Sequence, residues 1–357
     1  MSGRRALAAV AVVLIIGAIV YFESRTVDRG PGDSGGADIT LESMSAEEKA
    51  KRYERAKEIT TPDAFVNVAR VSIAEELEKG NVVLVDFWTY SCINCQRTIP
   101  YLSAWHERYG GSGLTIIGVH TPEFEFEQEL TNVQRAVEQF DIEYPVVLDN
   151  DYSTWKSYNN RYWPRKYLID IDGFVVYDHI GEGGYEETEA KIRELLAERA
   201  ARRGEAAPGT SDLVSDDVRA DAPSGGVTPE TYFGASRNTA LGNIIRGRVG
   251  VQEAAVPGTL AQDVTYLGGT WNIHDEYAES VGAGTIVLSY RAKVVNLVAS
   301  SDVPVRVSVV QDGKKVKDIT IEDATLYELV RSDESGVHTL ELEISEGGLR
   351  AFTFTFG

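Results

Sequence analysis

The chain has 357 residues, of which 43% are hydrophobic, and a formal net charge of −20. That length suits two ordinary domains, and the acidity argues against nucleic-acid binding, which relies on basic residues that neutralise phosphates. With two cysteines, the sequence excludes a disulfide-rich scaffold and a zinc site built from four cysteines.

The N-terminus has the pattern of a membrane anchor. Arg4 and Arg5 precede an uncharged run of 17 residues from Ala6 to Phe22, just long enough to cross a bilayer. The two arginines favour a cytoplasmic start of the chain. We therefore predict an uncleaved, single-pass transmembrane helix within residues 1–25. The rest of the chain would then lie on the extracytoplasmic (periplasmic or outer) side. A cleaved signal peptide is the alternative.

Residues 26–59 are predicted to form a linker and a spacer helix. The first part is rich in glycine and aspartate, which is typical of a flexible linker. Further on, Ser45 and Glu48 have the spacing of a capping box, and charges of both signs alternate along the stretch. We expect a short helix whose surface is solvated.

Between residues 60 and 203, strand and helix patterns alternate. Buried strands are predicted over VVLVDFW, LTIIGVH and YPVVLDN. Helices are predicted after Cys92 and over EFEQELTNVQRAVEQFDI, YSTWKSYNNRY and YEETEAKIRELLAERAARR. A hairpin with its turn at Asp172-Gly173 is predicted over KYLIDIDGFVVYDHIG. This order indicates an α/β domain with a mixed central sheet flanked by helices.

The composition of the sequence changes after residue 203. Residues 204–227 are poor in apolar residues and rich in Ala, Pro, Gly, Ser and Asp, which predicts a linker. Residues 228–357 show alternation of apolar and polar residues with period two, broken by turns that contain glycine. This pattern predicts an all-β sandwich.

The two cysteines lie in the segment SCINC, with the spacing C-x-x-C, at the start of a predicted helix. A helix N-terminus offers free N–H groups and partial positive charge, which favour a thiolate nucleophile at Cys92. Cys95, one turn on, can then attack the mixed disulfide and release the partner. The pattern therefore favours thiol–disulfide exchange over a zinc site, a haem attachment site or a structural disulfide.

Three further residues bear on this chemistry. Asp86 is the one charged residue within VVLVDFW, and a carboxylate buried in a strand has a raised pKa suited to accepting the proton of Cys95. The alternative is a structural pair with a buried lysine. Pro100 falls inside the predicted helix, and Pro164 directly precedes a predicted strand.

Together these residues resemble the active-site segment of the thioredoxin superfamily. That family has an acidic residue six positions before the first cysteine, here Asp86, and a proline five positions after the second, here Pro100. It also has a cis-proline opening the strand beside the disulfide, best matched by Pro164. Within it, the extracytoplasmic thioredoxin-like part of DipZ proteins, and more loosely the TlpA- and ResA-type reductases, are similar to the segments WTYSCINCQRTIPYL, GVHTPEFEFE, NRYWPRKYLID and GEGGYEETE.

The resemblance implies a fold for each half of the chain. Residues 60–203 are expected to adopt the thioredoxin-like fold. The segment TPETYFG and the β-rich tail after it resemble the second extracytoplasmic domain of DipZ. That likeness implies a jelly-roll, carbohydrate-module-like fold for residues 228–357.

The resemblance also implies a substrate-binding site. A cis peptide before Pro164 would leave the backbone of Trp163 free to pair with a substrate chain, and would bar a metal from the two sulfurs. Trp88, Tyr90 and Trp163 would form an aromatic rim around the reactive cysteine. Neither a metal nor a cofactor is expected beyond the redox-active pair Cys92–Cys95.

The implied activity is that of a membrane-anchored, extracytoplasmic thiol–disulfide oxidoreductase. The uncharged pair Ile93-Asn94 between the cysteines favours a reductase over an oxidase. Its partners would be disulfide-bearing proteins, such as those awaiting haem attachment in cytochrome c biogenesis, or other envelope thiol proteins. DipZ proteins begin with a multi-span membrane domain, whereas one span is predicted here. Electrons are therefore expected from a separate membrane protein of the CcdA or DsbD kind.

Two other functions stay open at this point. Thr89 and Cys92 match part of the T-x-x-C signature of peroxiredoxins, although the proline expected just upstream is missing. A binding protein led by the β-domain is the other alternative. There, Trp271, His274 and Tyr277 could line a glycan site, although core or loop positions are the favoured interpretation.

Overall fold

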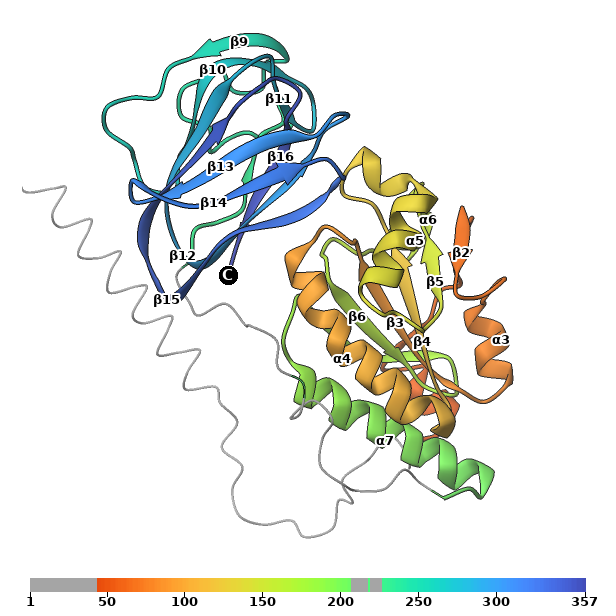
Figure 1. Cartoon of the computed structure of the whole chain (residues 1–357). Helices are drawn as coiled ribbons and strands as arrows, with labels where there is room; N and C mark the ends of the chain where they lie inside the picture. The colour runs from red at the N-terminus through yellow and green to blue at the C-terminus, as the bar shows by residue number, and fades with distance from the viewer. Residues whose placement is uncertain (1–43, 207–217, 219–226) are drawn as a thin grey trace, which may run out of the picture. The chain divides into compact units, whose positions relative to one another are not determined.

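The computed structural model describes residues 44–206, 218 and 227–357 (Figure 1), and residues 44–357 form one compact unit. The predicted anchor over residues 1–25 and most of the predicted linker over residues 204–227 lie outside the described residues. Within the described part of the chain, no helix has the length and apolar content needed to span a membrane.

A seven-stranded mixed sheet organises the first part of this unit. Its strand order is β1-β7-β6-β3-β4-β5-β2, and β3, β4 and β5 run parallel. The mixed sheet predicted from the sequence is therefore confirmed. The strands are β1 (Glu54–Arg55), β2 (Ala64–Val66), β3 (Val82–Trp88), β4 (Leu114–His120), β5 (Val146–Leu148), β6 (Arg165–Ile169) and β7 (Phe174–Ile180).

Every residue of β3 is buried, as its unbroken apolar, β-branched run predicts. On one face, Val83, Val85 and Phe87 pack with Ile73 and Trp155 in a hydrophobic cluster. Because side chains alternate along a strand, Asp86 faces the opposite side. The strand thereby carries one carboxylate into the interior of the domain.

Helices cover this sheet, and Figure 1 shows α4 lying across the strands with α7 beside it. The rings of Tyr101 on α4 and Tyr185 on α7 stack with centroids 3.5 Å apart. The helical elements are α3 (Ile73–Glu78), α4 (Ile93–Tyr109), η2 (Gly110–Ser112), η3 (Glu125–Gln128), α5 (Leu130–Gln139), α6 (Ser153–Ser157) and α7 (Tyr185–Arg203).

The segment from residue 44 to 59 differs from the predicted solvated spacer helix. The capping box of Ser45 and Glu48 is present, but the helix, α2 (Ala46–Lys49), has four residues only. Strand β1 then pairs with β7 and joins the sheet. Most of the segment is exposed as predicted, but Lys49 is fully buried, because its side chain enters an internal cluster of carboxylates.

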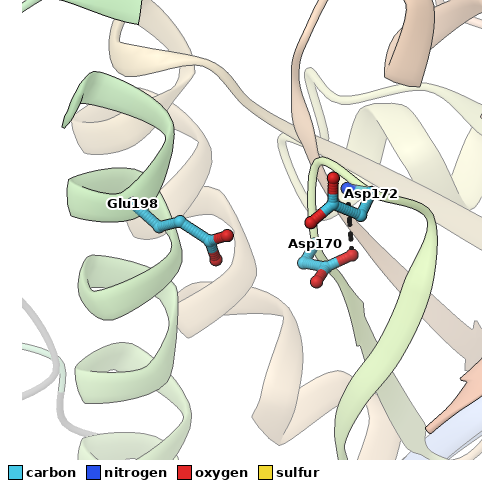
Figure 2. A group of neighbouring side chains, drawn as sticks. All are labelled: Asp170, Asp172 and Glu198. Carbon is cyan, nitrogen blue, oxygen red and sulfur yellow. Dashed lines mark hydrogen bonds between the residues drawn. The ribbon is translucent and has the colours of Figure 1, made fainter. Parts of the chain in front are cut away.

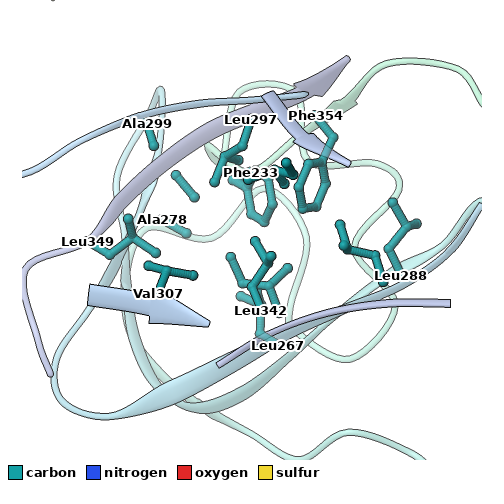
Figure 3. Packing of buried hydrophobic residues seen from close by; sticks show 14 of the residues in the cluster. Phe233, Leu267, Ala278, Leu288, Leu297, Ala299, Val307, Leu342, Leu349 and Phe354 are labelled. Carbon is teal, nitrogen blue, oxygen red and sulfur yellow. The ribbon is translucent and has the colours of Figure 1, made fainter. Parts of the chain in front are cut away.

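The second part of the unit is all-β, as predicted. Its nine strands are β8 (Thr231–Tyr232), β9 (Gly250–Ala254), β10 (Thr265–Ile273), β11 (Ala278–Ser280), β12 (Gly284–Ser300), β13 (Val305–Gln311), β14 (Lys314–Ile321), β15 (Thr325–Ile344) and β16 (Arg350–Phe356). They surround one large apolar core, and Figure 3 shows labelled members such as Phe233, Leu288, Leu342 and Phe354 directed into it.

Hydrogen bonds join these strands into one continuous sheet that bends around the core. The long strand β12 pairs with β10 up to Leu288 and with β16 from Val295 onward, while β15 follows it along the other edge. Register shifts between Ala292 and Val294, and between Val295 and Asn296, mark the place where β12 changes neighbours. Such irregularities bend a strand, which allows one sheet to enclose a core.

The aromatic candidates for a glycan site do not form one surface. Trp271 is fully buried, and its Nε1 donates a hydrogen bond to the carbonyl of Gly268 at 3.1 Å. His274 and Tyr277 stack on each other with ring centroids 4.4 Å apart. Trp271 is therefore a core residue, as the favoured interpretation of the sequence held.

Candidate active site

Cys92 stands at the N-cap of α4, and the helix continues through Pro100 to Tyr109. Its side chain is half-buried, whereas that of Cys95 is 1% exposed. The unpaired N–H groups of the first turn and the helix dipole favour negative charge at the position of Cys92. The two thiols thus differ in access, with one open to a partner and the other enclosed.

Cys95 is held as a neutral thiol. Desolvation, together with the neighbouring Cys92, raises the pKa of Cys95 well above its ordinary value. A buried thiol of this kind attacks a disulfide only if another group removes its proton, because the thiolate is the nucleophile. The site therefore requires a proton acceptor near Cys95.

Asp86 has the properties of that acceptor. Its side chain is 1% exposed, and its Oδ1 has no hydrogen-bond partner. Desolvation raises the pKa of Asp86 to about 7, against the opposing charge of Lys166. The Asp86 charge in turn contributes to the raised pKa of Cys95, which places the two groups within electrostatic reach of each other.

The sequence left two roles open for Asp86, a proton acceptor and the structural partner of a buried lysine, and Lys166 bears on both. It lies opposite Asp86 in the pairing of β3 with β6 and is fully buried. Its Nζ lies 3.3 Å from the carbonyl oxygen of Gly181, and desolvation lowers the pKa of Lys166. A buried lysine therefore lies close enough to Asp86 to affect its pKa, while Oδ1 of Asp86 has no hydrogen-bond partner and can accept a proton.

Pro164 and Trp163 lie beside the cysteines. The peptide bond between them is cis, as the resemblance implied. Trp163 is half-buried, donates from Nε1 to the carbonyl of Thr121 at 3.0 Å, and lines a cavity of about 470 Å³ together with Cys92. The cavity gives a partner access to the half-buried thiol.

The other two aromatic residues predicted for the rim do not line this cavity. Trp88 is 1% exposed and packs edge-on against His120, with ring centroids 5.1 Å apart. Tyr90 is 3% exposed, and its hydroxyl donates to the carbonyl of Ala324 at 3.0 Å. Trp88 ends the buried strand β3, and Tyr90 is covered by the β-domain residue Ala324, so of the predicted aromatic rim Trp163 alone lines the cavity.

Glu127, which the sequence analysis did not single out, fixes the loop before Cys92. The side chain of Glu127 is fully buried and accepts hydrogen bonds from the Ser91 hydroxyl at 2.7 Å and the Ser91 N–H at 3.3 Å. Its second oxygen accepts from the N–H groups of Glu123 at 2.6 Å and Phe124 at 3.0 Å. One carboxylate thereby ties the loop that ends at Cys92 to the loop after β4. The available signal was the stretch EFEFE, in which glutamates alternate with aromatic residues.

Glu127→Gln is expected to lower the free energy of unfolding by about 3 kcal/mol. The NH2 group of the glutamine would be placed against backbone N–H donors and could not accept their hydrogen bonds. Desolvation raises the pKa of Glu127 above its ordinary value, to about 6. The folded state therefore favours the protonated carboxyl, and the stability that this group contributes falls as the pH rises through about 6, so the loss in Glu127→Gln should be smaller at pH 8 than at pH 4. Urea unfolding at both pH values measures it. Glu129→Gln, at an exposed position in the same stretch, is the control.

One acidic cluster among the described residues has the spacing to hold a metal ion: Asp170, Asp172 and Glu198. Figure 2 shows the two aspartates at the turn after β6, with Glu198 on α7 opposite them. The ammonium of Lys49 lies between them, 2.7 Å from Asp170, 2.8 Å from Asp172 and 2.6 Å from Glu198. A protein cation thus fills the place that a metal would take.

Thr89, the residue behind the peroxidase alternative, is fully buried. Its hydroxyl lies 3.3 Å from Nε2 of His120. Burial lowers the pKa of His120 to about 3, so the ring is neutral at physiological pH. The hydroxyl of Thr89 therefore has an internal partner that carries no charge.

The chain is similar to known thioredoxin-like proteins. Residues 51–196 match the Redoxin family, and residues 228–357 match the family described as thioredoxin like C-terminal domain. The chain is 40% identical over 280 residues to protein DipZ of Mycobacterium tuberculosis, covering 78% of this chain and 39% of that protein. The chain thus spans less than half the length of this relative.

A shorter relative and a solved structure match smaller shares of the chain. The thiol–disulfide oxidoreductase YkuV of Bacillus subtilis is 27% identical over 143 residues, which cover 40% of this chain and 93% of that protein. The crystal structure of a thioredoxin-family thiol:disulfide interchange protein from Chlorobium tepidum superposes with a TM-score of 0.35 and 21% identity. It covers 41% of this chain and 97% of that one.

Proposed function

Because this chain belongs to the thioredoxin superfamily, with a Redoxin domain followed by a thioredoxin-like C-terminal domain, we propose that it is a thiol–disulfide oxidoreductase that reduces protein disulfides. The observation that carries the proposal is the unequal pair of thiols. Cys92 is accessible at a helix N-terminus, and Cys95 is enclosed near a buried carboxylate with a raised pKa.

The proposed reaction has two exchanges. The Cys92 thiolate attacks one sulfur of the substrate disulfide, forming a mixed disulfide and releasing the other substrate sulfur as a thiolate. Cys95 then passes its proton to Asp86 and attacks the sulfur of Cys92. The second substrate sulfur leaves as a thiolate, which takes up a proton. Two electrons have moved to the substrate, and the enzyme holds a Cys92–Cys95 disulfide.

A donor must return two electrons to close the cycle. We propose a separate membrane protein of the CcdA or DsbD kind, acting on a chain that is anchored by residues 1–25 and faces the extracytoplasmic side. Disulfides persist in that compartment, so a reductase has substrates there, such as proteins awaiting haem attachment or other envelope thiol proteins. The uncharged Ile93-Asn94 between the cysteines supports the reducing direction.

Insulin reduction by the chain, with dithiothreitol as electron source, tests the activity. Cys92→Ser is expected to abolish it, and Cys95→Ser to accumulate a mixed disulfide that is visible on a non-reducing gel. Retained activity in Cys92→Ser would refute the proposal, and turnover of hydrogen peroxide at a higher rate would favour the peroxidase alternative. The potential of the couple gives the direction, since about −270 mV matches thioredoxin and about −120 mV matches the oxidant DsbA.

A further inference from the structure

The cavity at Cys92 is built by both domains. From the thioredoxin-like domain, Asn94, Trp163 and Glu182 line it beside the cysteine. From the β-domain come side chains of the segment that leads into and follows β8, together with the C-terminal strand: Thr228, Pro229, Glu230, Tyr232, Arg237 and Phe356. A substrate that reaches the thiol therefore contacts the β-domain as well.

Polar contacts hold this β-domain wall against the thioredoxin-like domain. The guanidinium of Arg237 donates to the carboxylate of Glu123 at 2.6 Å and lies over the ring of Tyr232, 3.8 Å from its centroid. The hydroxyl of Tyr232 lies 3.0 Å from the Glu123 carboxylate and 2.9 Å from that of Glu230. The three β-domain residues thus have fixed positions at the cavity.

Apolar contacts also stabilise the boundary between the thioredoxin-like domain and the β-domain. Phe124 and Phe126, in the loop that Glu127 ties to Cys92, pack against Phe352 of β16 with ring centroids 5.1 and 4.7 Å apart. Aromatic pairs at this separation stabilise an interface beyond the area they bury. The β-domain side of the cavity is thus held by apolar as well as polar contacts.

The cavity lining holds three carboxylates and two guanidiniums, those of Arg161 and Arg237. Of the carboxylates, Glu123 is paired with Arg237, and Glu182 with Arg97 at 3.0 Å. Glu230 has no ion pair among the described residues, and the hydrogen bond that it accepts comes from the neutral hydroxyl of Tyr232. Desolvation and the nearby Glu123 raise the pKa of Glu230, against the opposing charge of Arg237.

We propose that the β-domain is a specificity element of the proposed reductase, and that the cavity binds protein segments in which a lysine or arginine lies next to the disulfide cysteine. The substrate cation pairs with Glu230 while Cys92 attacks the adjacent sulfur. The assignment deepens the proposed function and rests on it.

Synthetic disulfide peptides that differ only in the residue beside the cysteine test this, with lysine, alanine or glutamate at that position. For the wild-type chain, kcat/KM is expected to be about fivefold higher for the lysine peptide than for the alanine peptide, and lower still for the glutamate peptide. Glu230→Gln should remove the preference for lysine, and Glu230→Lys should reverse it in favour of glutamate. Added salt should weaken the wild-type preference.

Glu253→Gln, an exposed position on β9 of the same domain, is the matched control and should keep the wild-type ratio. Equal rates for the three peptides in the wild type, or an unchanged ratio in both Glu230 variants, would overturn the assignment. If the wild type reduced neither insulin nor any of the peptides, the proposed function itself would fail, and the assignment with it.

Discussion

Replacing Lys49 with methionine is expected to lower the free energy of unfolding by about 3–5 kcal/mol, the range observed when one partner of a buried ion pair is removed. The ammonium is fully buried between Asp170, Asp172 and Glu198, at 2.6–2.8 Å from each. Although desolvation opposes the charge, hydrogen bonds to these carboxylates raise the pKa of Lys49. Without it, the fully buried carboxylate of Asp170 loses its counter-ion, whereas Asp172 and Glu198 keep ion pairs with Arg202 at 2.7 and 2.6 Å.

Lys51→Met provides the control, because Lys51 is exposed two residues further along and should change stability by less than about 0.5 kcal/mol. Urea unfolding of both variants at pH 8 measures the difference. The deficit of Lys49→Met should shrink below about pH 5, where the uncompensated carboxylate can become protonated in the folded state. Equal stability of the two variants at pH 8 would show that the cluster contributes nothing to folding.

This cluster explains why residues 44–59 were misjudged from sequence. Alternating charges with a capping box indicate a solvated helix, and the pattern does not reveal that one lysine enters the protein interior. The three carboxylates that receive it lie more than a hundred residues away in sequence. A contact between residues so far apart in sequence forms only when the sheet and helix α7 have folded. Local periodicity therefore does not predict it.

The elements that carry the candidate active site were predicted more closely from the sequence than residues 44–59 were. The buried strand VVLVDFW, the helix that begins at Cys92 and the hairpin at Asp172-Gly173 are all found where their patterns placed them. Each depends on local rules: an apolar run, free N–H groups at a helix start, and a turn residue with positive φ at Gly173. Such local patterns can be recognised in a single sequence.

Side-chain direction and domain contacts were the parts that sequence did not supply. Trp88 and Tyr90 adjoin the cysteines in sequence, yet both are buried. Glu230 and Arg237 lie more than 130 residues from Cys92 and still line its cavity. The composite cavity depends on how two separately patterned domains pack, and neither pattern contains that information.

Asp86→Asn is expected to slow resolution of the mixed disulfide about 100-fold at pH 8, the scale of a lost general base. An amide cannot accept the proton of Cys95, and burial raises the pKa of that thiol so that it rarely ionises unaided. The first exchange, attack by Cys92, does not use Asp86. Stopped-flow measurement of Cys92-linked intermediates, trapped with a fluorescent thiol, separates the two steps.

The pH profile distinguishes this role from a structural one. Desolvation raises the pKa of Asp86 to about 7. Below that pH the carboxyl is protonated and cannot accept a proton; above it the carboxylate can. The wild-type resolution rate should therefore rise through about pH 7 and level off, whereas in Asp86→Asn it should keep rising toward the pKa of Cys95 itself.

Lys166→Met is the informative companion variant. The charge of Lys166 opposes the desolvation of Asp86 and so holds its pKa down. Its removal should shift the rise in the wild-type profile to higher pH while leaving the rate above that rise intact. A merely structural Asp86–Lys166 pair would instead predict that both variants lose stability and that neither changes the shape of the profile. If the profile of Asp86→Asn still rose at about pH 7, the acceptor would have to be another group.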